Sequence, residues 1–187
     1  GNVHTTGGGF AGSGVVGIAV DLGAGSGDVD ITTNGNVQVD NAVSGDGSFG
    51  VAGFAIGGNS TVTVNGNIDP PSVGASSFAL GGDATLNVGA YEVDALDLGL
   101  VATALGGNAD INASDSTVVS GGAGVLGTAI GGNTTIDTGD VTANGTGLGG
   151  TGIAGIAVDV GGTGGDVEIV THGTTDANGL FGIMALA

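Results

Sequence analysis

One stretch of the chain decides its fold: Gly50-Val-Ala-Gly-Phe-Ala-Ile56, then Gly57-Gly58-Asn59, then Ser60-Thr-Val-Thr-Val64, then Asn65-Gly-Asn-Ile68. It reads as an apolar segment, a turn, a segment that alternates polar and apolar residues, a second turn and a short third segment. Glycine costs about 1 kcal/mol in a helix interior, and β-branched residues add to that cost. Each segment is therefore predicted to be a strand, and the order is typical of one turn of a parallel β-solenoid.

The first segment belongs to a phrase that recurs along the chain. Its pattern is Gly–aliphatic–x–small–x–Ala with an aliphatic residue next, and it starts at Gly14, Gly50, Gly74, Gly99, Gly124, Gly152 and Gly179. A phrase repeated at such a period indicates one supersecondary unit stacked on copies of itself. We predict an all-β fold, a parallel β-solenoid with about three short strands per coil and about seven coils of 24–36 residues. Residues 1–187 form one repeat domain in this interpretation, and residues 1–12 lead into it.

The composition excludes several classes of partner. The formal net charge of -18 comes from 18 Asp and Glu residues, because the chain has no Lys and no Arg. Cationic side chains are needed to bind nucleic acid and anionic membrane surfaces, so neither is an expected partner. The absence of Cys leaves neither disulfides nor thiolate metal ligands. No run of about 18 apolar residues is present, and we expect no membrane insertion by this segment.

The second segment has the clearest alternation of apolar and polar residues. Its central residue is aliphatic in six repeats: Ile31, Val62, Leu86, Ile111, Ile136 and Ile169. Because side chains of a strand point alternately to its two faces, the flanking polar residues are expected on the solvent side. They form a candidate outward ladder of Thr61, Thr63, Thr85, Asn87, Asn112 and Thr135. Asp30, Asp110 and Asp137 interrupt this ladder.

The first segment is apolar on both faces, and its sequence leaves two interpretations open. We assign one face to the core: Val16, Ile18, Val20, Ala52, Phe54, Ile56, Ser76, Phe78, Leu80, Leu126, Thr128 and Ile130. The other face carries Val15, Val51, Ala75, Leu100, Val125, Ile153 and Leu180 beside columns of Gly and Ala. A strand that is apolar on both sides is usually covered on both sides. These residues therefore either fit a crowded interior or form an outward self-association strip that meets another chain.

The turn after the first segment forms another column, which reads Asp28, Asn59, Asp83, Asn108, Asn133 and Asp166 in successive repeats. No two Asp residues are adjacent in this column, so stacked carboxylates do not face each other and an Asn can donate to a neighbouring Asp. We interpret this alternation as an arrangement that avoids repulsion between neighbouring carboxylates, and not as a metal site.

Two further motifs resemble ligand sites. Gly12-Ser-Gly14-Val-Val-Gly17 matches a dinucleotide fingerprint, but that motif needs a strand before it and a helix after it. Gly161-Gly-Thr-Gly-Gly-Asp166 resembles the start of a calcium-binding nonapeptide, although Glu168 stands where an apolar residue belongs. We expect no cofactor; if calcium binds weakly, Asp28 and Asp166 are its candidate ligands.

No residue set favours catalysis. Polysaccharide-cleaving β-helices use clusters of Asp or Glu, often together with Lys or Arg. This chain has no such cation, and its only imidazoles are His4 and His172. His172 follows Thr171 and precedes Gly173, as a solvated turn residue would. We therefore expect the protein not to be an enzyme.

The repeat resembles the passenger repeats of bacterial autotransporters and filamentous-haemagglutinin-like adhesins. The resemblance is carried by Gly155-Ile-Ala-Val158 leading to Gly165-Asp166-Val-Glu-Ile169, and by Gly53-Phe-Ala-Ile56 leading to Thr61-Val-Thr-Val-Asn-Gly66. It implies a right-handed parallel β-helix at or beyond a bacterial outer surface that serves as a stalk, adhesin or fibre.

These observations favour two possible functions. The first is an extracellular structural or adhesive protein that self-associates laterally or end to end, and this chain is then a fragment or subunit of a longer array. The second is a binding module whose outward Thr/Asn ladder takes a carbohydrate, such as a host or surface glycan, or ice.

Overall fold

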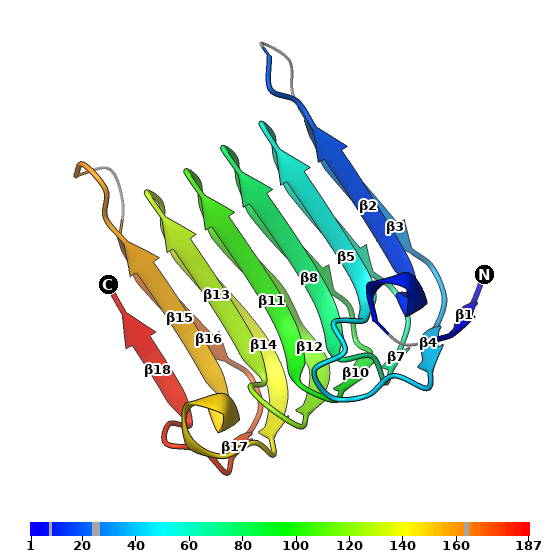
Figure 1. The fold of residues 1–187 in the computed structure, drawn as a ribbon. Coiled ribbons are helices and arrows are strands. Elements are labelled where there is room, and N and C mark those ends of the chain that lie inside the picture. Colours follow the sequence, from blue (N-terminus) through cyan, green and yellow to red (C-terminus); the bar gives the residue numbers. More distant parts are fainter. Residues whose placement is uncertain (8, 24–26, 163–164) are drawn as a thin grey trace.

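The computed structural model describes residues 1–7, 9–23, 27–162 and 165–187, and these residues form an all-β structure (Figure 1). Besides strands, the described residues contain two short 3₁₀ helices, η1 (Phe10–Gly12) and η2 (Gly147–Gly150). None of the helices in these ranges is both long and apolar enough to cross a membrane. All the strand pairs are parallel, so the prediction of an all-β fold built from parallel strands is confirmed.

The recurring phrase forms a seven-stranded sheet. Its strands pair in chain order, and each comes from the repeat after its neighbour's, as Figure 1 shows from β2 in blue to β18 in red. They are β2 (Val15–Val20), β5 (Phe49–Ile56), β8 (Val73–Leu80), β11 (Leu98–Leu105), β13 (Val125–Ile130), β15 (Ile153–Val158) and β18 (Ile183–Leu186).

The second and third segments form an eleven-stranded sheet that consists of two rows. The first row holds β3 (Val29–Thr33), β6 (Ser60–Val64), β9 (Ala84–Val88), the first halves of β12 (Ala109–Ser120) and β14 (Thr134–Ala143), and β16 (Val167–Thr171). The second row holds β1 (Val3–Thr6), β4 (Val37–Asp40), β7 (Ile68–Asp69), β10 (Glu92–Ala95), the second halves of β12 and β14, and β17 (Thr175–Ala177). In β12 and β14 the two segments merge into one long strand, with a register shift between Ala113 and Thr117.

Equivalent residues of successive repeats pair directly with one another. The predicted column of central aliphatic residues is confirmed, because Ile31, Val62, Leu86, Ile111, Ile136 and Ile169 are partners in register. The candidate strip behaves in the same way from Val15 through Val51, Ala75, Leu100 and Val125 to Ile153.

The seventh member of that column is Ile183, so the assignment of Leu180 was wrong. The backbone N–H groups of Gly179 and Leu180 donate to the carbonyls of Gly150 and Gly147. This pairing places Gly179 and Leu180 in a turn beside η2 instead of in a strand, and the last phrase begins at Gly182.

The candidate self-association strip lies inside the molecule. Val51, Ala75, Leu100, Val125 and Ile153 are all 0% exposed and belong to one core cluster, against which Val15 packs. The interpretation of these residues as an outward strip is therefore wrong, and the crowded-interior alternative is correct. Leu180, the remaining member, is exposed but lies in the turn described above.

Close packing between the sheets explains both this orientation and the Gly that opens each phrase. A Cβ atom on Gly74 would lie 2.5 Å from the carbonyl oxygen of Gly99 in the next repeat, and it would overlap Val93 of the facing sheet. The equivalent glycines at 14, 50, 99, 124 and 152 face the same obstruction. Only glycine lets the backbones approach this closely, since a Cβ–oxygen separation this short is a steric overlap.

The other face of the phrase, which was assigned to the core, points outward. Ile18 is 61% exposed, Val20 57%, Leu80 42% and Ile130 38%, and Phe54, Ile56, Phe78, Leu126 and Thr128 are partly exposed. Ala52 and Ser76 also lie on this side but are covered. That assignment was therefore wrong. Because side chains alternate along a strand, the strip and this second group of residues must lie on opposite faces of the sheet. The Gly and Ala residues beside the strip allow its face to pack closely, so the strip is on the inner face.

Candidate functional site

The outer side of the seven-stranded sheet carries many of the exposed apolar side chains of the described residues, including Ile18, Val20, Leu80, Ile130 and Val158. Three columns of side chains in register point outward from it, and one of them, Val16, Ala52, Ser76, Val101, Leu126, Ala154 and Met184, is buried or only partly exposed. We call the other two columns the apolar face. They are Ile18, Phe54, Phe78, Thr103, Thr128, Ile156 and Leu186 in one column, and Val20, Ile56, Leu80, Leu105, Ile130 and Val158 in the other. Contiguous exposed apolar surface of this kind marks interaction sites in soluble proteins.

Aromatic rings cluster at one end of the apolar face. The ring centroids of Phe54 and Phe78, on adjacent strands, are 6.3 Å apart. Phe49 meets Phe54 edge to face at 5.5 Å, and Phe10 of η1 lies 6.3 Å from Phe54. These separations fall in the range in which aromatic pairs attract each other. The half of the face that contains β5 and β8 is therefore bulkier than the half that contains β13 and β15.

Charge is segregated between the two sheets. None of the seven strands behind the apolar face contains a charged residue. The strands of the eleven-stranded sheet contain Asp30, Asp40, Asp69, Glu92, Asp94, Asp110, Asp115, Asp137, Asp140, Glu168 and Asp176. The strands of one sheet are therefore uncharged and apolar, and the strands of the other sheet are acidic.

The outward ladder lies where the sequence predicts it, on the outer side of the first row of the eleven-stranded sheet. Thr61, Thr85, Asp110 and Thr135 are register partners, and so are Thr63, Asn87, Asn112 and Asp137. The amide of Asn112 donates to Oδ1 of Asn87 at 3.0 Å. The ladder is thus partly exposed and polar, but carboxylates interrupt both of its columns.

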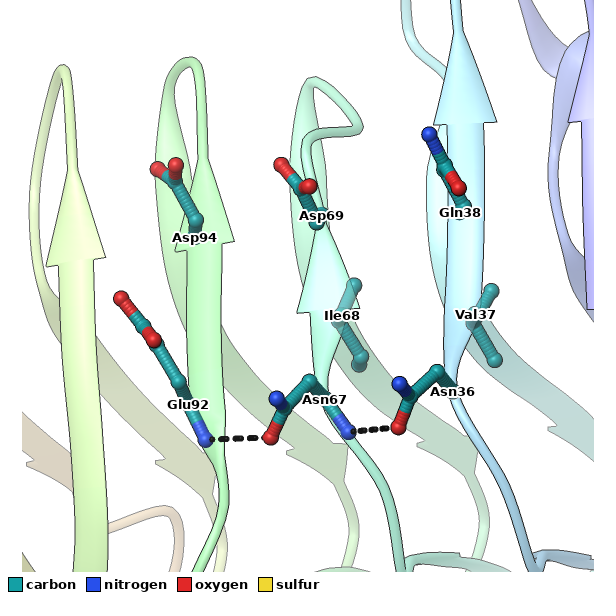
Figure 2. A pocket seen from close by; sticks show the side chains of 8 residues that line it. All are labelled: Asn36, Val37, Gln38, Asn67, Ile68, Asp69, Glu92 and Asp94. Carbon is teal, nitrogen blue, oxygen red and sulfur yellow. Dashed lines mark hydrogen bonds between the residues drawn. The ribbon is translucent and has the colours of Figure 1, made fainter. Parts of the chain in front are cut away.

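A shallow pocket of about 250 Å³ lies on the outer side of the second row. Figure 2 shows Gln38, Asp69 and Asp94 side by side on β4, β7 and β10, with Asn36, Asn67 and Glu92 beneath them. Burial raises the pKa of Asp94, and the neighbouring Asp69 and Glu92 raise it further. This pocket was not predicted from the sequence, although Asn36, Asn67 and Glu92 recur one repeat apart and could have indicated it.

Side chains at two turns tie successive repeats together by hydrogen bonds to the backbone. In the predicted column, Oδ1 of Asp28 accepts the N–H of Asn59 at 2.7 Å, and the same bond recurs from Asn59 through Asp83, Asn108 and Asn133 to Asp166. A second column, Asn2, Asn36, Asn67 and Glu92, repeats the pattern with 3.1 Å bonds (Figure 2). The predicted donation from an Asn side chain to a neighbouring Asp is not the bond that forms; because only a side-chain acceptor is used, Asp and Asn are interchangeable there.

Asp97 anchors the loop between β4 and β5. Its carboxylate accepts hydrogen bonds from the hydroxyls of Ser44 and Ser72 and from the N–H of Gly45 at 2.6 Å. Burial alone would raise the pKa of Asp97, but these hydrogen bonds outweigh burial and lower it. In the same loop, hydrogen bonds from Ser48 and Val43 outweigh burial and lower the pKa of Asp46 to about 2.

We predict that the protein is most stable near pH 4, well below neutrality. Burial is the main cause that raises the pKa values of Asp94 and Asp110, so protonating them favours the folded state as the pH falls from 7. Asp46 and Asp97 have lowered pKa values, so their stabilisation is lost as the pH falls below about 3.9, the value expected in the unfolded chain.

The thermal unfolding midpoint measured at pH 7, 4 and 2 tests this prediction. It should be highest at pH 4, and Asp94→Asn should raise the midpoint at pH 7 and shrink the gain on acidification. A midpoint that falls continuously from pH 7 to pH 2 would contradict the assignment.

The dinucleotide-like motif is not assembled into a nucleotide site, and the calcium-like motif lies partly outside the described residues. The glycines at 12–17 lead into strand β2, so the helix that a dinucleotide fingerprint requires does not follow them. Residues 163 and 164 of the calcium-like motif lie outside the described residues, and Oδ1 of Asp28 is bonded to Asn59. Within the described part of the chain, no three His, Cys, Asp or Glu side chains are grouped to hold a metal. His172 Nε2 lies 3.0 Å from Asp137 Oδ1, and both side chains are more than a third exposed.

Comparison with known proteins gives no match: no protein-family model, no curated protein and no solved structure matches this chain. What indicates a function is therefore the chemistry of the chain's own surfaces. Of these, the apolar face and the acidic outer side of the eleven-stranded sheet differ most in chemistry.

Proposed function

We propose that the chain is a right-handed parallel β-solenoid that works at or beyond a bacterial cell surface as a rigid, self-associating stalk or fibre. The observation that carries this proposal is the unbroken register, in which each segment pairs in parallel with the same segment of the next repeat. A chain that winds once per repeat produces such a register, and parallel crossovers are right-handed in nearly all known cases.

Rigidity follows from the way the repeats are joined. One core cluster runs through strands of both sheets, and hydrogen bonds from two turn columns link each repeat to the next. Seven stacked phrases span about 29 Å, since neighbouring strands lie about 4.8 Å apart. In such an array each repeat contacts only its neighbours, so added repeats lengthen the rod without changing its width.

Four features support a structural role outside the cell. The repeats resemble the passengers of autotransporters and filamentous-haemagglutinin-like adhesins, which are surface stalks and fibres. The chain also has no cysteine, which suits an exported protein, and its charge of -18 keeps the acidic side hydrated. The apolar face supplies a surface through which such a protein self-associates.

Negative-stain electron microscopy of the purified chain, over a range of concentrations, tests the structural role. We expect extended assemblies whose number grows with concentration. Isolated short particles at every concentration, in a sample whose circular dichroism is β-rich, would contradict a role as a stalk or fibre.

The second candidate is carbohydrate binding, which one observation favours. The pocket on β4, β7 and β10 presents amides and carboxylates, the groups that hydrogen-bond sugar hydroxyls. A glycan array that finds a ligand, with binding lost in Gln38→Ala and retained in Asn112→Ala, would support it. Ice binding is disfavoured because Asp30, Asp110 and Asp137 interrupt the outward ladder, and the absence of thermal hysteresis would exclude it.

A further inference from the structure

We propose that the apolar face is the interface of a symmetric homodimer, with the seven-stranded sheets of two copies packed face to face. The proposal rests on the proposed structural function and names the partner and the surface through which self-association occurs.

The face is large enough for a stable interface. Seven strands about 4.8 Å apart extend about 29 Å, and six residues of strand extend about 20 Å, so the outline of the whole sheet is about 580 Å² on each copy. The column of Ala52, Ser76 and Ala154 within this outline is covered. The outlines of two copies together measure about 1,160 Å², and specific interfaces need about 1,000 Å² or more, so the side chains that protrude from the two exposed columns must supply most of the contact. Ile18, Val20, Leu80, Ile130 and Val158 are between 38% and 61% exposed, so much of this area is open to a partner.

Charge favours a second copy over other occupants. No strand of the sheet carries a charged residue, so nothing in these strands pairs with a charged partner. The chain has no Lys or Arg to attract an anionic lipid surface. Two copies packed through their apolar faces point their acidic sheets in opposite directions, which separates the two charges of -18 as far as the dimer permits.

The face is also self-complementary. A two-fold axis that runs along β11 reverses the strand order of the second copy and sets β8 of one copy against β13 of the other. Phe78 then meets Thr128, so the bulky half of the column packs on the half with smaller side chains, and Thr103 lies on the axis. Sheets packed in this way lie about 10 Å apart, and side chains of the two inner faces interdigitate.

Light scattering coupled to size-exclusion chromatography tests the dimer on the full chain. We expect the smallest species of the parent protein to be a dimer, with any extended assemblies eluting ahead of it. The double variant Leu80→Asp with Ile130→Asp should raise the dissociation constant about 100-fold or more, because desolvated like charges would face each other. Thr128→Asp is a second variant, chosen because the position is already polar and tolerates a polar side chain without unfolding.

The matched control is Thr32→Asp with Asn112→Asp. It adds the same charge at exposed positions on the outer side of the other sheet and should leave the dimer intact. A monomeric parent, dimers that persist in both apolar-face variants, or equal dissociation of the control would each overturn the proposal.

Microscopy of the same samples separates this inference from the structural role. If the parent forms extended assemblies but its folded apolar-face variants keep the same dimer in light scattering, the interface is wrong and the stalk or fibre stands. If the dimer depends on the apolar face but the parent forms no extended assemblies, the interface stands and the stalk or fibre is wrong.

Discussion

Val125→Asp is expected to abolish folding, whereas Ile130→Asp on the same strand leaves the chain folded. Val125 is 0% exposed inside the core, and Ile130 is 38% exposed on the apolar face. An unpaired buried carboxylate costs several kcal/mol, which is comparable with the whole stability of a typical domain, about 5–15 kcal/mol. Circular dichroism and denaturant unfolding at pH 7 measure the difference.

Both variants add one negative charge, so the comparison isolates the direction in which the side chain points. A folded Val125→Asp protein with parent-like stability, or an unfolded Ile130→Asp protein beside a folded Val125→Asp protein, would reverse the assignment of the two faces.

Gly74→Ala is expected to destabilise the chain by about 3 kcal/mol or more, although it adds a single methyl group. The new Cβ atom would lie 2.5 Å from the carbonyl oxygen of Gly99 and would overlap Val93, so the backbones of two repeats would have to move apart. The free energy of unfolding, measured in urea, gives the size of the effect.

Gly182→Ala is the matched control, because Gly182 opens the last phrase and a Cβ atom there meets nothing within 4 Å. We expect it to change stability by no more than about 1 kcal/mol, and to stabilise if it changes at all. Equal effects at the two positions would show that close packing between repeats does not explain the glycine of the phrase.

The sequence alone predicts the repeat, the parallel strands and the columns in register. It succeeds best at the second segment, where Val62 and Ile111 alternate with polar residues and the alternation identifies the inner face. Alternation does not identify the inner face of the first segment, because Val51 and Phe54 point to opposite faces and both are apolar. The glycine and alanine columns beside Val51 do contain the missing signal, since small residues are needed where two sheets approach closely.

Other features depend on contacts that a repeat pattern does not encode. The match of Gly179 and Leu180 to the phrase is a coincidence of composition, which the pairing of Ile153 with Ile183 and the hydrogen bonds of this turn to Gly147 and Gly150 reveal. The column of Asp28 and Asn59 was predicted, but its bonds run to the backbone of the next repeat. The pocket forms only when the third segments of three repeats lie side by side, as Asp69 and Asp94 do, so no single repeat indicates it.

The measurement that tests the account most directly is a set of distances between pairs of spin labels along one column. The chain has no native cysteine, so labels can be placed at Thr32 and, in separate variants, at Asn112, Asp137 or Val170. These positions belong to one column of register partners on the outer side of the eleven-stranded sheet.

Stacking of one repeat on the next predicts distances of about 14, 19 and 24 Å, which grow by about 4.8 Å at each step. The two increments should be equal although the chain between Asp137 and Val170 is longer than that between Asn112 and Asp137. Unequal increments that follow the separation along the chain would contradict the stacked architecture on which the proposed function and the proposed dimer both depend.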